Sequence, residues 1–468
     1  MFRFNIAIVI RFGSLWNIQM LIFPVYLRRT LNHTSGKLTA RPLCSSAAQP
    51  LDDDVRKHNK PKQASIPQVT QTSKKARSSC QLILDHFDEQ YSEELGDLWT
   101  SARSVLLDPP SWQYGVLLNR FTVLTDIKRV LLSQGFSTLL PQKEALTSPG
   151  VLRTMFSAEC QMSKSPSDNS HLQRDNSSRA PVQQAQSESR LGPPSSSLQC
   201  YIHPNPLRFP SQAHRSGQLK QYYLLNAASL LPVLALQVRD GEKVLDLCAA
   251  PGGKALAIMQ CATPAFLCCN EPDSHRLGRL AKTLESFLPR SLSSRVAVSA
   301  QDGRSFGESQ AGIYDKVLVD APCSNDRSWL FSSAGQQVEQ RLKERGRLPQ
   351  LQVQLLRSAL SAVRPGGIVV YSTCTMSSSE NFAVVEAVLK DCPEAEPEDL
   401  WDEIANPLSS YFTFSPAHCV SGLVPNSQSL QPQHGRVSSY NRTLGILVVP
   451  QPCKTWGPMF LSRLKKRK

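Results

Sequence analysis

The sequence contains 13 cysteines but lacks any Cys-x-x-Cys pair. This absence argues against a zinc ribbon and a thioredoxin-type redox site, which both need closely spaced thiols. Cys261, Cys268 and Cys269 lie near one another in the chain, but no second ligand pair accompanies them. We therefore interpret them as buried thiols and expect no metal. The odd number and scattered positions of the cysteines are typical of a reducing compartment.

The first 50 residues lack aspartate and glutamate, whereas arginines are spread through them. This composition is typical of a mitochondrial presequence, so we expect residues 1–50 to direct the chain to the mitochondrial matrix. A signal anchor is the alternative, because residues 15–27 are apolar. That run is too short for a membrane-spanning helix and contains Pro24, so we expect no membrane span.

The formal net charge of +14 favours a polyanionic partner, because lysine and arginine displace counterions from phosphates. Charge alone does not decide the question, since many mitochondrial proteins are basic. Several basic residues before the first predicted strand and at the end of the chain are candidate RNA contacts, although each could equally be a solvated surface charge: Arg208, His214, Arg215, Lys220 and residues 465–468.

Changes in composition divide the rest of the chain into four parts. Residues 51–79 are polar and indicate a linker. Residues 80–160 begin with apolar positions at three- and four-residue steps, which predicts a small, mainly helical domain that we expect to recognise RNA. Residues 161–199 are rich in serine and glutamine and lack aromatics, so they are predicted to be a disordered insert. Residues 200–468 remain for a catalytic domain.

Short runs rich in β-branched residues alternate with helical patterns in this last part. The runs lie at residues 243–248, 266–271, 295–302, 315–322 and 366–374. The alternation predicts an α/β fold with a parallel sheet that helices cover on both faces. Two later runs, 444–450 and 458–464, are expected to close the sheet as an antiparallel pair.

A glycine-rich turn, Asp246 to Lys254, follows the first predicted strand and opens a helix. In open α/β sheets ligands bind at such strand ends, and the helix start offers free N–H groups. The turn matches neither a dinucleotide fingerprint nor a phosphate-binding loop. Glu271, Asp302 and Asp320 follow the next three strands and should lie along the same edge. A carboxylate after the second strand is placed to accept hydrogen bonds from ribose hydroxyls.

Two cysteines follow strands at the same edge, Cys323 in Asp-Ala-Pro-Cys-Ser and Cys374 in Ser-Thr-Cys-Thr. A lone cysteine at a strand end is most often a small buried side chain. Two cysteines at the mouth of one site, each beside hydroxyl residues, suggest thiol chemistry instead. Methylation of cytosine at carbon 5 needs such chemistry. A thiolate must first add to carbon 6, and a carboxylate near the ring is also required.

Five strings in this order carry a family resemblance: DLCAAPGGK, CNE, QDG, DAPCS and YSTCT. Over residues 200–465 the chain resembles the Nop/Sun family of RNA 5-methylcytosine methyltransferases. The resemblance implies a Rossmann-like, S-adenosylmethionine-dependent methyltransferase fold with a mostly parallel seven-stranded sheet. Three further strings resemble mitochondrial members of the family and imply the wobble cytosine of mitochondrial methionine transfer RNA as the target: LDHFDEQYSEELGDLW, YYLLNAASLLPVLAL and DAPCSNDRSWLF.

The resemblance also implies a role for each site residue. The turn would bind the methionine part of S-adenosylmethionine through Cys248, Ala249, Ala250, Pro251, Gly252, Gly253 and Lys254. Glu271 would bind the ribose and Asp302 the adenine, and Asp320 would lie between cofactor and target cytosine. Lys254 would also contact the reacting groups. The insert at 161–199 departs from the family pattern and puts the extent of the RNA-binding region in doubt.

The choice between the two cysteines rests on their motifs. DNA cytosine methyltransferases use a Pro-Cys nucleophile, which would nominate Cys323. The downstream Thr-Cys motif, absent from those enzymes, favours Cys374 as the nucleophile, and Cys323 would then help to release the product.

Two other functions remain open at this point. A non-catalytic RNA-binding or assembly factor could use the same fold, but both cysteines and Asp320 are intact. A methyltransferase for proteins or small molecules gives no reason for two cysteines in the site. The sequence indicates no obligate protein partner.

Overall fold

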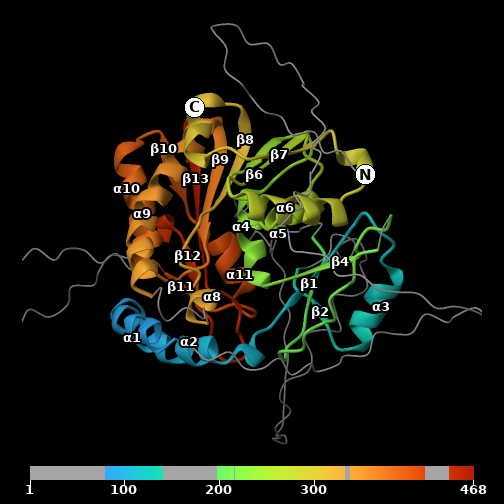
Figure 1. Ribbon diagram of the computed structural model, residues 1–468, viewed down its shortest axis with the longest axis horizontal. Helices are drawn as coiled ribbons and strands as arrows, with labels where there is room; N and C mark the ends of the chain where they lie inside the picture. The colour runs from blue at the N-terminus through green and yellow to red at the C-terminus, as the bar shows by residue number, and fades with distance from the viewer. Residues whose placement is uncertain (1–79, 141–197, 216, 332–337, 417–441) are drawn as a thin grey trace, which may run out of the picture. The chain divides into compact units, whose positions relative to one another are not determined.

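The computed structural model describes residues 80–140, 198–215, 217–331, 338–416 and 442–468 (Figure 1). These residues belong to one unit of the chain, Ser73–Lys468. The predicted presequence (1–50), the predicted linker (51–79) and all but the last two residues of the predicted insert (161–199) lie outside them, so these assignments stay predictions.

A mixed sheet forms the centre of this unit. Its strands in the described ranges are β5 (Lys243–Asp246), β6 (Phe266–Asn270), β7 (Val296–Ser299), β8 (Tyr314–Asp320), β9 (Val363–Thr373), β10 (Ala395–Glu398), β11 (Phe414–Pro416), β12 (Ile446–Val448) and β13 (Met459–Lys466). Strands β7-β6-β5-β8-β9 are parallel neighbours in that order. Antiparallel β13, β12 and β11 continue the sheet beyond β9, and β10 pairs with the end of β13.

The predicted fold class is confirmed. The five predicted runs form the parallel strands, and the two late runs form the antiparallel pair β12 and β13. Together these seven strands have the expected Rossmann-like arrangement. The short strands β10 and β11 were not predicted. Each contains a proline, Pro397 or Pro416, which argues against a strand unless it lies at an edge.

Helices lie on both sides of this sheet (Figure 1). α4 (Leu231–Leu236), α5 (Gly253–Cys261) and α6 (Ser274–Phe287) lie on one side, and α9 (Val338–Ala362) and α10 (Phe382–Asp391) lie on the other. None of the helices in the described ranges combines the length and the apolar character that crossing a membrane requires. The remaining α-helices are α1 (Gln81–Leu95), α2 (Asp97–Leu107), α3 (Thr125–Ser133), α7 (Phe306–Ser309), α8 (Asp326–Leu330) and α11 (Asn406–Leu408).

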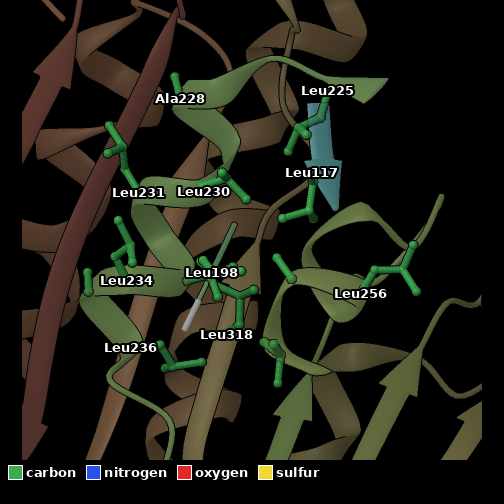
Figure 2. Packing of buried hydrophobic residues seen from close by; sticks show 14 of the residues in the cluster. Leu117, Leu198, Leu225, Ala228, Leu230, Leu231, Leu234, Leu236, Leu256 and Leu318 are labelled. Carbon is green, nitrogen blue, oxygen red and sulfur yellow. The ribbon is translucent and has the colours of Figure 1, made fainter. Parts of the chain in front are cut away.

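Alternate residues of the central strands enter two separate apolar clusters. Val244 of β5 and Leu318 of β8 join one cluster with α4, α5 and α6. Figure 2 shows part of it, with Leu231 and Leu234 of α4 in the same cluster as Leu318. Leu245 of β5 packs on the other face with α1, α2, α9 and α10. Burial on both faces explains why these strands are apolar almost throughout.

The N-terminal region differs from the separate helical domain that we expected for residues 80–160. Its helices α1 and α2 pack into the same cluster as α9 and α10. A second sheet has the order β2-β3-β1-β4, formed by β1 (Gly115–Leu118), β2 (Ser137–Thr138), β3 (Cys200–Ile202) and β4 (Tyr222–Leu225). β1 pairs with both β3 and β4, so this sheet crosses the expected boundary at residue 200. A four-residue apolar run such as β1 cannot be told from a helix segment by periodicity.

Candidate active site

The glycine-rich turn joins the end of β5 to the start of α5 as predicted. Gly252 has φ +109°, in the left-handed region that side chains rarely adopt. A Cβ at Gly252 would lie 3.1 Å from Cγ2 of Thr283, and a Cβ at Gly253 would lie 3.0 Å from Cε1 of Tyr223. The turn therefore packs closely against α6 and β4, and both glycines are needed for this approach.

A cavity of about 160 Å³ opens beside this turn. The predicted cofactor residues that line it are Cys248, Ala249, Ala250, Pro251, Gly253, Lys254 and Asp320. Gly252, Glu271 and Asp302 were predicted as well but do not line it. Tyr223, Leu224 and Leu225 of β4 form another wall, which sequence reasoning missed.

Asp246 lies at the bottom of this cavity and is fully buried. Neither of its carboxylate oxygens has a hydrogen bond of good geometry among the described residues. Burial, and then the nearby Asp320, raise the pKa of Asp246 to about 8. The site thus contains a carboxyl group whose raised pKa favours the protonated form at neutral pH, and sequence analysis predicted no role for it.

Glu271 and Asp302 differ in their surroundings. Glu271 is buried, and its Oε1 accepts a hydrogen bond from the Asp273 N–H at 3.1 Å. Its Oε2 accepts no hydrogen bond in the described structure and lies 3.3 Å from Arg276. Asp302 is about half exposed and pairs with Arg304 at 2.6 Å, which holds its pKa below the ordinary value. Both carboxylates thus have an arginine partner, but Glu271 is buried whereas Asp302 is about half exposed.

Asp320 connects the cavity to the strand that carries Cys374. Lys254 Nζ donates to Asp320 Oδ2 at 2.8 Å, and Ser372 Oγ donates to Asp320 Oδ1 at 3.0 Å. Burial alone would lower the pKa of Lys254, but the attraction of Asp320 outweighs burial and raises it. Lys254 is therefore held as a cation beside Asp320, which precedes Cys323 by three residues.

The structure brings Cys323 and Cys374 together. Their sulfur atoms lie 3.2 Å apart, and the Cys374 backbone N–H donates to the Cys323 sulfur at 3.3 Å. The hydrogen bond with Cys374, followed by burial, holds the pKa of Cys323 well above its ordinary value. Burial and the neighbouring sulfur thus favour the neutral thiol of Cys323, and either sulfur can be the donor in the contact between them.

Buried Glu380 holds the loop that carries Cys323. Its carboxylate accepts hydrogen bonds from Ser324 N–H at 3.0 Å, from Ser324 Oγ at 2.5 Å and from Gln352 Nε2 at 3.0 Å. Arg345 Nε lies 3.5 Å from the same carboxylate. Both Gln352 and Arg345 come from α9, so this helix fixes the position of the Cys323 loop.

Thr375 holds the loop that carries Cys374. Its hydroxyl donates to Asp326 Oδ1 at 2.8 Å and lies 3.2 Å from the Tyr91 hydroxyl. The Tyr91 hydroxyl also accepts from Arg345 at 3.0 Å, and Asp326 accepts from the Met376 N–H at 2.8 Å. Burial raises the pKa of Asp326 to about 6. Sequence reasoning missed this network, because polar residues on amphipathic helices usually indicate a solvated face.

The basic residues at the end of the chain lie away from the cysteines. Lys466 Nζ donates to the carbonyl of Val363 at 3.1 Å, and Val363 is the first residue of β9. Cys374 follows the last residue of β9. Lys466 and Cys374 therefore lie near opposite ends of this strand. Among the residues that the structure describes, no cluster of His, Cys, Asp and Glu side chains could hold a metal ion.

Comparison with known proteins connects this site to one reaction. A family model described as 16S rRNA methyltransferase RsmB/F matches residues 233–419, which include the turn, Asp320 and both cysteines. The chain is 50% identical over 394 residues to the mitochondrial tRNA (cytosine(34)-C(5))-methyltransferase of Danio rerio, across 84% of this chain and 90% of that protein. It is 43% identical over 393 residues to the Mus musculus protein of the same name, across 84% of this chain and 92% of that one. It is also 38% identical over 316 residues to a 5-cytosine rRNA methyltransferase of Xenopus tropicalis. This match covers 66% of this chain and 76% of that protein.

Proposed function

The chain belongs to the Nop/Sun family of RNA cytosine-5 methyltransferases, and on this premise we propose that it methylates carbon 5 of the wobble cytosine of mitochondrial methionine transfer RNA. The observation that carries the proposal is the match to proteins named for cytosine 34 of a transfer RNA over at least 90% of their length. The acid-free residues 1–50 and the mitochondrial names of both relatives support action in the mitochondrial matrix.

S-adenosylmethionine is the proposed methyl donor, and it supplies the methyl group when bound. The buried Asp246 carboxyl, which can both donate and accept, and the buried Glu271 carboxylate would fit its polar groups and its ribose hydroxyls. Residues Cys248 to Lys254 would hold the methionine part, with Glu271 at the ribose. Asp302 could reach the adenine only while sharing its carboxylate with Arg304.

Cys374 is the proposed nucleophile. Its thiolate adds to carbon 6 of cytosine, a C–S bond forms, and the displaced electron pair makes carbon 5 nucleophilic. The Lys254–Asp320 pair is placed to hydrogen-bond the polar edge of the ring and fix its orientation. After methyl transfer a base removes the proton from carbon 5. The electron pair of that C–H bond restores the C5–C6 double bond, and the C–S bond breaks to return the thiolate.

Cys323 is proposed to assist this last step. Its neutral thiol already lies 3.2 Å from the Cys374 sulfur. Donation of a hydrogen bond to Cys374 stabilises the negative charge that develops on this sulfur as the C–S bond breaks, so Cys374 becomes a better leaving group.

Bisulfite sequencing of mitochondrial RNA with and without the protein tests the proposal. Cytosine 34 of methionine transfer RNA should lose its protection when the protein is absent, and the purified protein should restore it with S-adenosylmethionine. Protection that stays at position 34, or that disappears only in ribosomal RNA, would contradict the proposed substrate.

A further inference from the structure

The side chain of Arg327 is held in place by three separate parts of the chain. It belongs to α8, four residues after Cys323. Its guanidinium lies over the ring of Trp112, 4.5 Å from the centroid, and one of its N–H groups donates to the backbone carbonyl of Thr455. Its Nε is buried and has no hydrogen-bond partner in the described structure. The fold therefore uses one face and one N–H of this group, and the buried Nε has no acceptor among the described residues.

No carboxylate of the described residues forms an ion pair with Arg327, although this arginine is partly buried. Burial lowers the pKa of Arg327 to about 10, and only Tyr114 and Cys374 act in the opposite direction. Other buried arginines do have acidic partners: Arg345 lies 3.5 Å from Glu380, and Arg463 lies within 2.8 Å of two glutamates. A buried charge without a counter-charge is strongly unfavourable. The surroundings of Arg327 thus lack an anion.

The position of Arg327 indicates which kind of anion would pair with its guanidinium. Asp326, the residue before Arg327, accepts hydrogen bonds from the Thr375 hydroxyl and the Met376 N–H, so α8 begins beside the segment that follows Cys374. Cys374 is also one of the two groups whose charge acts on Arg327. The other group is Tyr114, and Arg208 lies over the Tyr114 ring at 4.6 Å. Trp112 and Tyr114 are two positions apart in the chain, so the two arginine–aromatic pairs lie on one segment. Alternating cations and aromatic rings are typical of sites that bind a single nucleic acid strand.

We propose that Arg327 binds an RNA backbone phosphate directly next to the target cytosine, and that Tyr114 and Arg208 contact the adjoining nucleotide. The inference rests on the proposed function, because it assumes that the cytosine at Cys374 is part of an RNA strand. A phosphate beside the guanidinium would supply the missing negative charge. Binding the phosphate on one side and the base through Cys374 would hold the nucleotide at two points.

Binding of a fluorescein-labelled anticodon stem–loop, followed by anisotropy at several salt concentrations, tests this role. Arg327→Met should weaken binding about ten-fold and reduce the salt dependence by about one phosphate contact. Arg327→Lys should keep most of the salt dependence, because it keeps the charge. The matched control is Arg120→Met. Arg120 also has a buried Nε without a partner in the described structure and donates to the backbone carbonyl of Ala262 at 2.7 Å, near the amino ends of β5 and β6. This variant should bind RNA like the wild type.

A second measurement begins with the wild-type protein, where no variant has to fold. Stem–loops that carry one neutral methylphosphonate at successive positions should bind the wild-type protein more weakly only when the change flanks the target cytidine. The same RNA should lose no further affinity for a folded Arg327→Met protein. Equal losses in both proteins, or no loss at the flanking phosphates, would overturn the inference. Failure of the wild type to methylate the unmodified stem–loop would count against the proposed function instead.

Discussion

At the scale of single residues, the two cysteines have different surroundings. Cys323 accepts the Cys374 backbone N–H and keeps its own proton, because the neighbouring sulfur and burial both raise its pKa. Cys374 stands at the end of β9, two residues after the Ser372 that binds Asp320. The proposed mechanism gives these two sulfurs separate roles, attack for Cys374 and support of product release for Cys323.

Substitution of each cysteine should separate these two roles. Cys374→Ala should abolish methylation and form no covalent complex with RNA. Cys323→Ala should form the complex but fail to resolve it, because the intermediate is blocked at its second step. A denaturing gel after incubation with transfer RNA and S-adenosylmethionine measures both results. Cys392→Ala, which changes a partly buried free cysteine, is the control. A complex from Cys374→Ala but not from Cys323→Ala would reverse the assignment.

Asp246 should make stability depend on pH. Its pKa in the folded protein is raised to about 8, so the folded state holds the proton more tightly than the unfolded state. The resulting stabilisation is complete below the ordinary carboxyl pKa and is lost as pH rises toward about 8. Asp246→Asn, which stays neutral, should gain on the order of a few kcal/mol over the wild type between about pH 5 and pH 8. Urea unfolding at the two pH values measures this, and a constant difference would show that the pKa is not raised.

At the scale of elements, α1 does more than cover the sheet. Its Gln90 donates to Ser377 Oγ at 3.0 Å, and its Glu94 accepts from the Ser378 N–H at 2.9 Å. Together with Tyr91 these residues bind the segment that follows Cys374. An element that we expected in a separate RNA-recognition domain therefore helps to position the catalytic loop.

Tyr91→Phe should slow the covalent step more than it destabilises the protein. The change removes one hydroxyl that contacts Thr375 and Arg345. This loss should lower the free energy of unfolding by about 1–2 kcal/mol. The rate of adduct formation should fall while affinity for S-adenosylmethionine stays the same. Tyr314→Phe is the matched control, because the hydroxyl of this buried tyrosine donates to Gln310 instead. Equal rates in the two variants would show that the Tyr91 contact does not position the loop.

The elements also show what a sequence can and cannot reveal. The strands and the acids at their ends were predictable, because β-rich runs alternate with helical patterns and parallel strands end at one edge. The cavity wall at Tyr223 and the hydrogen-bond network through Arg345 could not be predicted from the sequence. Both features depend on contacts between segments that are far apart in the chain. In the sequence, Tyr91 is only one of several apolar positions of a predicted amphipathic helix. Asp302 followed the pattern of the other acids, yet its partial exposure and its pairing with Arg304 could not be foreseen.

At the scale of the whole molecule, residues 1–50 carry a prediction of their own. Their arginines and their lack of acidic residues should direct a fused fluorescent reporter into mitochondria. Replacement of the arginines by glutamine should leave the same reporter in the cytosol, because import depends on the positive charge. Microscopy with a mitochondrial marker measures both results. Secretory or cytosolic location of the unchanged fusion would contradict the prediction.

The contacts around Cys374 also determine when the catalytic centre can form. Tyr91 and Thr375 are 284 positions apart, and β13, near the last residue of the chain, borders β9. Folding slows when contacts join distant parts of a chain. A polypeptide that is still being synthesised, or is still crossing a membrane in extended form, therefore lacks part of the frame around its nucleophile. The surroundings of Cys374 are therefore complete only after β13 has been synthesised and has paired with β9.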